Sequence, residues 1–146
     1  MKKVVFVCLG NICRSPLAEG IARAYVAQKG YAIEVDSAGT SGYHDGEPPH
    51  HYSIDVARKH GVDIRGLRSS RVSAYMEADL FVAMDSANVA DLLRLGIESS
   101  KVVKVGEYGL DGTDIPDPYY KGIEGFDEVY EMLEVSVKRL LDSLNG

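Results

Sequence analysis

The sequence has little cysteine, no long apolar run and little positive charge. Its two cysteines, Cys8 and Cys13, are too few for a disulfide framework or for a four-ligand zinc site. No stretch reaches the ~18 apolar residues that a membrane helix needs, so we expect no membrane insertion. The formal net charge of -6 argues against a protein that binds nucleic acid through a basic face.

The length of 146 residues favours a single domain over residues 1–146, because about 150 residues is typical of one core. Hydrophobic residues make up 45% and charged residues 26%, which excludes a wholly disordered chain. The apolar stretch at residues 4–9 is too short for a signal peptide and leads into polar residues without a suitable cleavage site. We therefore expect a cytoplasmic protein.

Apolar residues alternate between the two periods that distinguish strands from helices. The predicted strands are residues 4–7, 33–35, 80–83 and 102–105. The predicted helices are residues 16–30 with Ser15 as N-cap, residues 53–60, a segment capped by Asp85 or Ser86 that reaches Leu95, and a long final helix over residues 129–144. Strands separated by helices pair in parallel, which predicts a three-layer α/β sandwich.

Two long segments, residues 40–51 and 106–125, fit neither a strand nor a helix. Loops of this length in a compact domain are usually functional. The carboxyl ends of parallel strands share one edge of a sheet, and ligands bind there. We therefore expect the residues that follow the four strands to meet around one crevice.

The turn after the first strand, residues 8–16, has the features of an anion site. Backbone N–H groups and the helix dipole favour negative charge at a helix N-terminus. Gly10 and Asn11 tolerate the positive φ that a loop around an oxyanion requires, and Arg14 offers a planar fork for two phosphate oxygens. Cys8, beside both, should ionise readily and act as a nucleophile towards phosphorus.

A phosphate ester also needs a proton for its leaving group, and the second long segment offers three aspartates. Asp111, Asp114 and Asp117 are all candidates, and spacing alone does not choose among them. Their three-residue repeat does not match the two-residue spacing of a calcium loop. Tyr119 and Tyr120 would form an aromatic wall at the mouth of the crevice.

The motifs C-L-G-N-I-C-R-S-P, D-S-A-G-T and D-P-Y-Y resemble those of the low-molecular-weight protein tyrosine phosphatases, and the similarity covers nearly the whole chain. The resemblance implies a four-stranded parallel sheet in the order 2-1-3-4, with helices on both faces. It makes Cys8 the nucleophile, Arg14 the phosphate clamp and Asp117 the general acid. It implies tyrosine-phosphorylated proteins as substrates, inorganic phosphate or vanadate as ligands, and neither a metal nor a cofactor.

The same resemblance gives supporting roles to nearby residues. Ser15 would hydrogen-bond the thiolate, and Asn11 would hold the loop in shape through Ser37 and His60. Tyr43 would line the pocket. The residues expected to bind substrate or phosphate are Leu9, Gly10, Asn11, Ile12, Cys13, Ser15, Tyr43, Tyr119 and Tyr120.

Several alternatives stay open at this stage. Cys13 could form a reversible disulfide with Cys8 or be a packed loop thiol. An arsenate reductase on the same fold needs a relay of three cysteines, which two cannot supply. A phosphoarginine phosphatase shares the loop but carries Thr in the family where Ile12 stands. A non-catalytic phosphoprotein-binding module would not need Cys8, Arg14 and Asp117 together.

The remaining polar clusters predict no further site. His44, His50 and His51 match no metal-binding spacing, so we expect solvated loop histidines. Arg65, Arg68 and Arg71 could guide a phosphorylated peptide, but such a cluster is usually a solvated connection.

Overall fold

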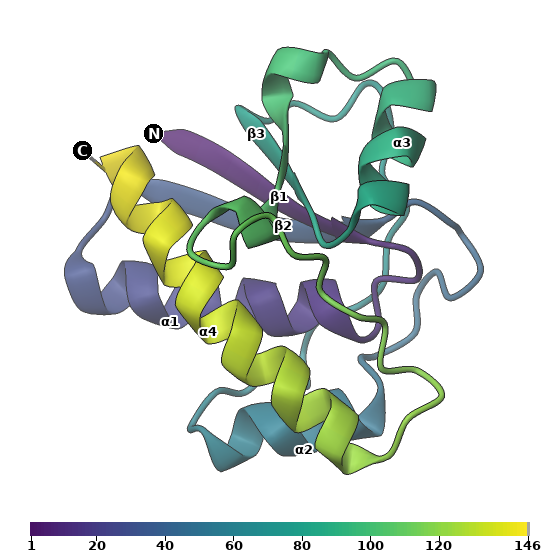
Figure 1. Cartoon of the computed structure of the whole chain (residues 1–146), viewed down its shortest axis with the longest axis vertical. Coiled ribbons are helices and arrows are strands. Elements are labelled where there is room, and N and C mark those ends of the chain that lie inside the picture. Colours follow the sequence, from purple (N-terminus) through teal and green to yellow (C-terminus); the bar gives the residue numbers. More distant parts are fainter. Residues whose placement is uncertain (146) are drawn as a thin grey trace.

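A computed structural model describes residues 1–145 as a four-stranded sheet between two layers of helices (Figure 1). The strands are β1 (Lys2–Cys8), β2 (Ile33–Gly39), β3 (Leu80–Ala83) and β4 (Val102–Lys104). All neighbouring strands run parallel, in the order β2-β1-β3-β4. The predicted three-layer α/β fold and its strand order are therefore confirmed.

Within residues 1–145, four α-helices and two short 3₁₀ turns accompany the strands. The helices are α1 (Arg14–Lys29), α2 (His51–Lys59), α3 (Ser86–Arg94) and α4 (Ile123–Asn145), and the 3₁₀ turns are η1 (Ser99–Lys101) and η2 (Val105–Glu107). Figure 1 shows α1, α2 and α4 together on one side of the sheet and α3 on the other. Strand β1 is paired on both edges, with β2 and β3, and helices cover both faces of the sheet around it.

The side chains of β1 alternate between two hydrophobic cores, as the two-residue period of a strand requires. Val4 and Phe6 pack in the core that includes residues of α1 and α4, while Val5 and Val7 pack in the core on the α3 side. All four side chains are fully buried. This double burial explains why the sequence shows a continuous apolar run here instead of alternation.

The start of α1 differs from the prediction. The helix begins at Arg14, Cys13 occupies the N-cap position, and no side chain caps the helix there. The prediction of Ser15 as N-cap is wrong, because the Ser15 hydroxyl bonds to Cys8 and Asn11 instead of to the helix backbone. The predicted end is confirmed, with Gly30 at φ 69° in the left-handed conformation.

Other boundaries move where polar residues conceal the pattern. Strand β2 continues past the predicted residues 33–35 to Gly39, because its polar second half pairs with β1 up to the Cys8–Gly39 partners. The final helix starts at Ile123, earlier than predicted. Asp85 is the N-cap of α3 and forms a capping box with Asn88, which resolves the choice between Asp85 and Ser86.

The two ends of the chain lie side by side at the edge where the strands begin. Met1 and Lys2 line a shallow hollow together with Leu144 and Asn145. This edge is opposite to the one at which β1 ends in Cys8. Within residues 1–145, no helix has the length and apolar character needed to cross a membrane.

Candidate active site

Residues that follow three of the four strands line one pocket at the carboxyl edge of the sheet, as predicted, whereas the residues after β3 do not line it. The cavity has a volume of about 420 Å³. It is lined by Cys8, Leu9, Gly10, Ile12, Cys13, Arg14, Ser41, Tyr43, His44, Asp117, Tyr119 and Tyr120. These residues come from three segments: the turn between β1 and α1, the loop after β2, and the long loop after η2.

The phosphate loop (residues 8–15) holds the Cys8 sulfur at a fixed point. The backbone N–H of Asn11 donates to Cys8 Sγ at 3.3 Å, and Ser15 Oγ lies 3.0 Å from the same sulfur. Asn11 Nδ2 donates to Ser15 Oγ at 2.7 Å, and the Ser15 hydroxyl proton is free to donate to a sulfur that has lost its own proton. Both contacts would stabilise a thiolate.

The side chain of Asn11 fixes the shape of this loop from behind. Asn11 takes a φ of 55°, the left-handed conformation expected from the sequence. Its amide donates to Ser37 Oγ at 3.0 Å and accepts from the backbone N–H of Ser70 at 3.0 Å. The Ser37 hydroxyl in turn donates to Glu19 at 2.6 Å. The network is buried, which makes each of these bonds costly to lose.

One predicted member of the network lies elsewhere. The His60 ring stacks on Tyr130, with ring centroids 4.1 Å apart, and the side chain of Asn11 bonds to Ser15, Ser37 and Ser70 instead. The predicted tie between Asn11 and His60 is therefore wrong. Glu19 was not predicted to belong to this network, because a glutamate four residues before Arg23 has the pattern of an ordinary exposed helix pair.

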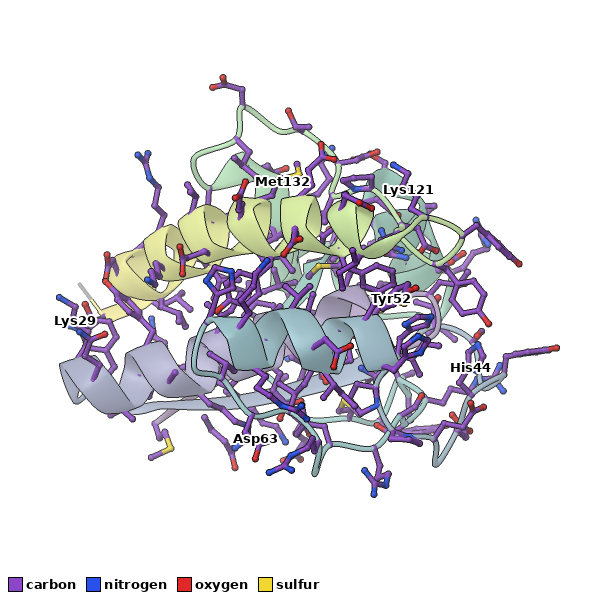
Figure 2. All side chains as sticks on the ribbon, turned by 90° about the horizontal axis from the view of Figure 1, so that it is seen from below. Lys29, His44, Tyr52, Asp63, Lys121 and Met132 are labelled. Carbon is purple, nitrogen blue, oxygen red and sulfur yellow. The ribbon has the colours of Figure 1, made fainter. Side chains whose placement is uncertain are left out.

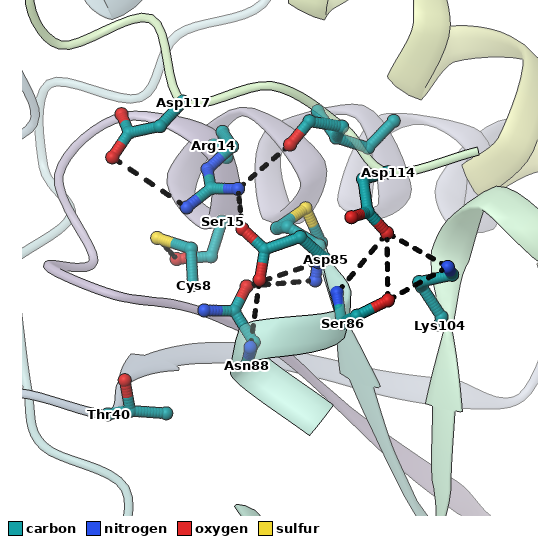
Figure 3. Close-up of polar contacts among 12 residues, drawn as sticks. Cys8, Arg14, Ser15, Thr40, Asp85, Ser86, Asn88, Lys104, Asp114 and Asp117 are labelled. Atoms are coloured by element: carbon teal, nitrogen blue, oxygen red, sulfur yellow. Dashed lines mark hydrogen bonds and ion pairs between the residues drawn. The ribbon is translucent and has the colours of Figure 1, made fainter. Parts of the chain in front are cut away.

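Arg14 joins three parts of the site (Figure 3). One guanidinium nitrogen, Nη1, donates to Asp85 Oδ2 at 2.6 Å and to the backbone carbonyl of Ile115 at 2.9 Å. The other terminal nitrogen, Nη2, lies 3.8 Å from Asp117 Oδ2. Burial acts to lower the pKa of Arg14, but the charges of Cys8, Asp85 and Asp117 outweigh it and raise the pKa. The guanidinium is thus a permanent cation with its plane fixed.

The sequence predicted only a helix-capping role for Asp85. In the structure it caps α3 with one oxygen and holds Arg14 with the other. A signal was present, because Asp85 follows β3 at the carboxyl edge of the sheet, where ligand-binding residues gather.

The three candidate acids in the loop before α4 have different surroundings. Asp117 faces Arg14 and lines the pocket. Asp114 accepts hydrogen bonds from Lys104 at 2.8 Å and from Ser86, and these bonds keep the pKa of Asp114 below its ordinary value. Asp111 sits at a turn with φ 54° and does not line the pocket. Among the three, only Asp117 reaches the pocket.

Aromatic side chains form the rim of the pocket. Tyr43 and Tyr120 are 85% and 96% exposed, whereas Tyr119 is 38% exposed. The His44 ring packs between them, 5.0 Å from Tyr43 and 6.1 Å from Tyr119 by ring centroids. The expectation that His44 is merely a solvated loop residue is wrong, because it lines the pocket.

Gly10 has a different reason for being glycine than the sequence suggested. It does not adopt the positive φ that we expected of it. A Cβ at Gly10 would lie only 3.1 Å from Cδ2 of His44, so the missing side chain makes room for the histidine against the phosphate loop.

His50 and His51 continue the aromatic cluster away from the pocket. The His50 ring stacks on Phe126 at 4.8 Å, and its Nδ1 accepts from the backbone N–H of Tyr52, which caps α2. In Figure 2, the labelled His44 and Tyr52 lie at the same end of the molecule as Lys121. Within the described chain, no group of three His, Cys, Asp or Glu side chains is close enough to hold a metal ion.

Cys8 and Cys13 are both free, buried thiols that line the pocket. Burial raises the pKa of Cys13 far above its ordinary value, and the neighbouring Cys8 adds to this effect. Cys13 therefore stays protonated at neutral pH. Whether it pairs with Cys8 under oxidation stays a prediction from the sequence.

Comparison with known proteins places this geometry in a family. Residues 3–146 match the model of the low molecular weight phosphotyrosine protein phosphatases. The Bacillus subtilis low molecular weight protein-tyrosine-phosphatase YfkJ is 38% identical, and the match covers 99% of this chain and 96% of YfkJ.

Solved structures agree with this match. The crystal structure of YfkJ superposes with a TM-score of 0.92 over 99% of this chain and 94% of that one. A protein tyrosine phosphatase from Entamoeba histolytica, 32% identical, also gives 0.92, over 99% and 97% of the two chains. Vibrio vulnificus Wzb, 25% identical, gives 0.88 over 97% and 98%.

The fold and the site define a hydrolase that acts on phosphate esters. The chain belongs to the low molecular weight phosphotyrosine protein phosphatase family, as the sequence motifs indicated.

Proposed function

We propose that the protein hydrolyses phosphotyrosine in proteins, and small aryl phosphates, through a phosphocysteine intermediate on Cys8. The observation that carries the proposal is that the Cys8 sulfur, which accepts a hydrogen bond from the backbone N–H of Asn11, lines the same pocket as the buried Arg14. Asp117 faces the same guanidinium from the opposite wall. A nucleophile, an anion clamp and a proton donor therefore share one pocket.

In the first step, the substrate phosphate lies in the phosphate loop with its oxygens on backbone N–H groups and on Arg14. The Cys8 thiolate attacks phosphorus in line and forms the S–P bond as the P–O bond to the phenol breaks. Asp117 donates its proton to the departing phenolate. The Ser15 hydroxyl, 3.0 Å from the sulfur, helps to hold the negative charge of the thiolate before attack.

In the second step, the Asp117 carboxylate removes a proton from water. The water oxygen attacks phosphorus, the S–P bond breaks, and phosphate leaves. The sulfur recovers its electron pair and is again held by Ser15 and by the backbone N–H of Asn11. The same carboxyl group thus serves as acid and then as base, so each turnover restores the starting state.

The walls of the pocket support an aryl substrate. Leu9, Ile12 and Tyr119 line the space above the sulfur, and they present apolar surface to a phenyl ring. The crystal structure of Vibrio vulnificus Wzb was determined in complex with benzylphosphonate, which also carries an aromatic ring. Phosphotyrosine reaches further than phosphoserine, so it is the natural ester for a recessed nucleophile.

The first test is turnover of p-nitrophenyl phosphate in the presence of EDTA. We expect steady hydrolysis that vanadate inhibits, and a non-catalytic binding module would give none. Cys8→Ser should abolish turnover and phosphoenzyme formation while retaining vanadate binding. Cys13→Ser, which changes the other thiol of the same loop, is the matched control and should still form the phosphoenzyme.

A second test addresses the thiolate and the substrate. Iodoacetate at mildly acidic pH should modify Cys8 in the native protein, and vanadate should protect it. The absence of such a thiol would refute the proposed mechanism. Peptides that carry phosphotyrosine should be turned over faster than peptides that carry phosphoarginine, and the opposite order would assign the site to phosphoarginine.

We further propose tyrosine-phosphorylated proteins as the substrates and the cytoplasm as the place of action. Two free thiols in one loop suit a reducing compartment. Trapping with Cys8→Ser in a cell lysate, with elution by vanadate, would identify the substrate proteins.

A further inference from the structure

Lys104, the last residue of β4, makes contacts that the chemistry described above does not use. Its Nζ donates to Asp114 Oδ1 at 2.8 Å and to Ser86 Oγ at 3.2 Å (Figure 3). Its side chain is only 17% exposed. A largely covered lysine with an acidic partner is a fixed point and differs from a freely rotating surface cation.

Asp114 receives more than the lysine. The backbone N–H and the hydroxyl of Ser86 both donate to the same Asp114 oxygen, each at 3.2 Å. Three donors from two different elements therefore converge on one carboxylate oxygen. An ordinary surface ion pair contributes little, but a pair with converging donors and a covered partner can hold a segment in place.

The residue after Asp114 extends this attachment to the pocket. Ile115 is fully buried, its N–H donates to the Met84 carbonyl at 2.9 Å, and its carbonyl accepts from Arg14 at 2.9 Å. Asp117 follows two residues later, and its side chain is 46% exposed. Its own contacts are a 3.8 Å approach to Arg14 and a 3.1 Å bond from the N–H of Tyr119. Its position thus depends on the attachment just before it.

The chain on the other side of Asp114 is also closely packed. Gly112 N–H donates to the carbonyl of Gly106 at 3.0 Å. A Cβ on Gly106 would lie 1.8 Å from the Thr113 carbonyl oxygen, so only glycine fits there. The loop therefore folds back against the residues that follow β4, and Lys104 lies where these two segments of the chain meet.

We propose that Lys104 is a positioning residue for the general acid: by holding Asp114 against Ser86, it keeps Asp117 at the pocket. The inference rests on the proposed function, because it takes Asp117 as the acid. Lys104 touches neither substrate nor sulfur, and it acts only through the segment from Asp114 to Asp117.

The test compares kcat/KM for two aryl phosphates, since this ratio reports the first chemical step. Phenyl phosphate needs a proton on its leaving group, whereas p-nitrophenyl phosphate needs it far less. Lys104→Met should lower kcat/KM for phenyl phosphate by about 10- to 100-fold, the loss expected when an acid is displaced by about 1 Å. The loss for p-nitrophenyl phosphate should be much smaller. Asp114→Asn should give the same pattern.

Two further variants separate positioning from general damage. Lys104→Arg keeps a cation that can donate to both partners, and it should recover most of the phenyl phosphate activity. Lys138→Met removes a partly exposed lysine that is paired with Glu134 at 3.8 Å, and it should change kcat/KM for neither substrate. Vanadate affinity and the midpoint of thermal unfolding, measured on every variant, show whether the phosphate loop and the fold are intact.

A double-mutant cycle with Asp117→Ala completes the test. In the Asp117→Ala background, Lys104→Met should cause little further loss, because no acid is left to position. Three results would overturn the proposal. The first is an equal loss of kcat/KM for both substrates, the second is additive losses in the cycle, and the third is no loss in either Lys104→Met or Asp114→Asn. If Asp117→Ala itself shows no leaving-group dependence, the proposed role of Asp117 fails instead.

Discussion

The phosphate loop and the Asp117 loop (residues 110–122) face each other across Arg14, but they are held in different ways. Asn11, Ser15 and Arg14 in the phosphate loop are at most 2% exposed, and each side chain makes hydrogen bonds inside the protein. In the other loop, Asp117 is half exposed and Tyr120 stands almost wholly in solvent. In the proposed function, the capture of phosphate would thus depend on the core, while proton transfer and substrate contact would depend on residues at the surface.

Apart from Cys8→Ser, which removes the proposed nucleophile itself, the largest expected effect falls on the surface side of this comparison. Asp117→Ala should lower kcat/KM for aryl phosphates with poor leaving groups by about 10²–10⁴-fold, the usual contribution of a placed general acid. Esters with good leaving groups should lose much less. Steady-state kinetics over a series of substituted phenyl phosphates measures this. If Asp111→Ala produces the leaving-group dependence and Asp117→Ala does not, the acid is misassigned.

The next effect tests the buried side. Asn11→Ala removes the amide that links Ser15, Ser37 and Ser70, so the free energy of unfolding should fall by about 1–3 kcal/mol and turnover should fall with it. Urea unfolding and p-nitrophenyl phosphate assays measure the two losses. Asp111→Ala is a matched control, because Asp111 has nearly the same φ, 54° against 55°, in an exposed turn. Equal losses in both variants would assign the effect to backbone strain alone.

A smaller effect concerns the junction of the rim with α2. Burial and the charge of His51 lower the pKa of His50, whose unprotonated Nδ1 caps the helix. The folded state therefore binds this proton less readily than the unfolded state, whose histidine pKa is about 6.5. The stabilisation is complete above that value and is lost as the pH falls through it towards the lower folded pKa.

His50→Asn replaces the titrating cap with one that does not titrate, since asparagine is a good N-cap. Between about pH 7.5 and about pH 5.5, the variant should lose less stability than the parent, by a fraction of the ~1 kcal/mol that a cap contributes. Thermal unfolding at both pH values measures the difference. Identical pH dependence in the two proteins would show that His50 does not control it.

The smallest kinetic effect is expected at Tyr120, the most exposed side chain of the rim. Tyr120→Ala should raise KM for phosphotyrosine peptides several-fold more than KM for small aryl phosphates, because only the longer ligand extends over the rim. Tyr75→Ala is the matched control, since Tyr75 is 95% exposed and does not line the pocket. A larger change for the small ester than for the peptide would show that Tyr120 contacts the aryl ring itself and not the rest of the peptide.

The sequence correctly predicted features that depend only on residues close together in the chain. The buried run of β1, the left-handed Asn11 and the helix end at Gly30 each depend on a few neighbouring residues. The strand order and the proposed role of Asp117 came from the family resemblance. Spacing alone left three aspartates as candidates for the general acid.

The sequence could not predict contacts between distant segments. Glu19, Asp85 and His44 each look ordinary in their own element: a helix ion pair, a helix cap and a loop histidine. Glu19 bonds to Ser37, 18 residues away, and Asp85 bonds to Arg14, 71 residues away, while the His44 ring contacts that of Tyr119. The predicted contact of His60 with Asn11 was wrong for a related reason: the His60 ring stacks on Tyr130, a distant residue that the sequence did not indicate as its neighbour.

The neighbouring chain ends have a practical consequence for finding substrates. Met1 and Asn145 lie at the edge of the sheet opposite to Cys8. A bead, a fluorescent protein or a labelling enzyme attached through either terminus would therefore leave the mouth of the pocket facing outward. A trapping variant tethered in this way presents its whole rim to a mixture of phosphoproteins, and an artificial linker between the ends should be accommodated by the fold.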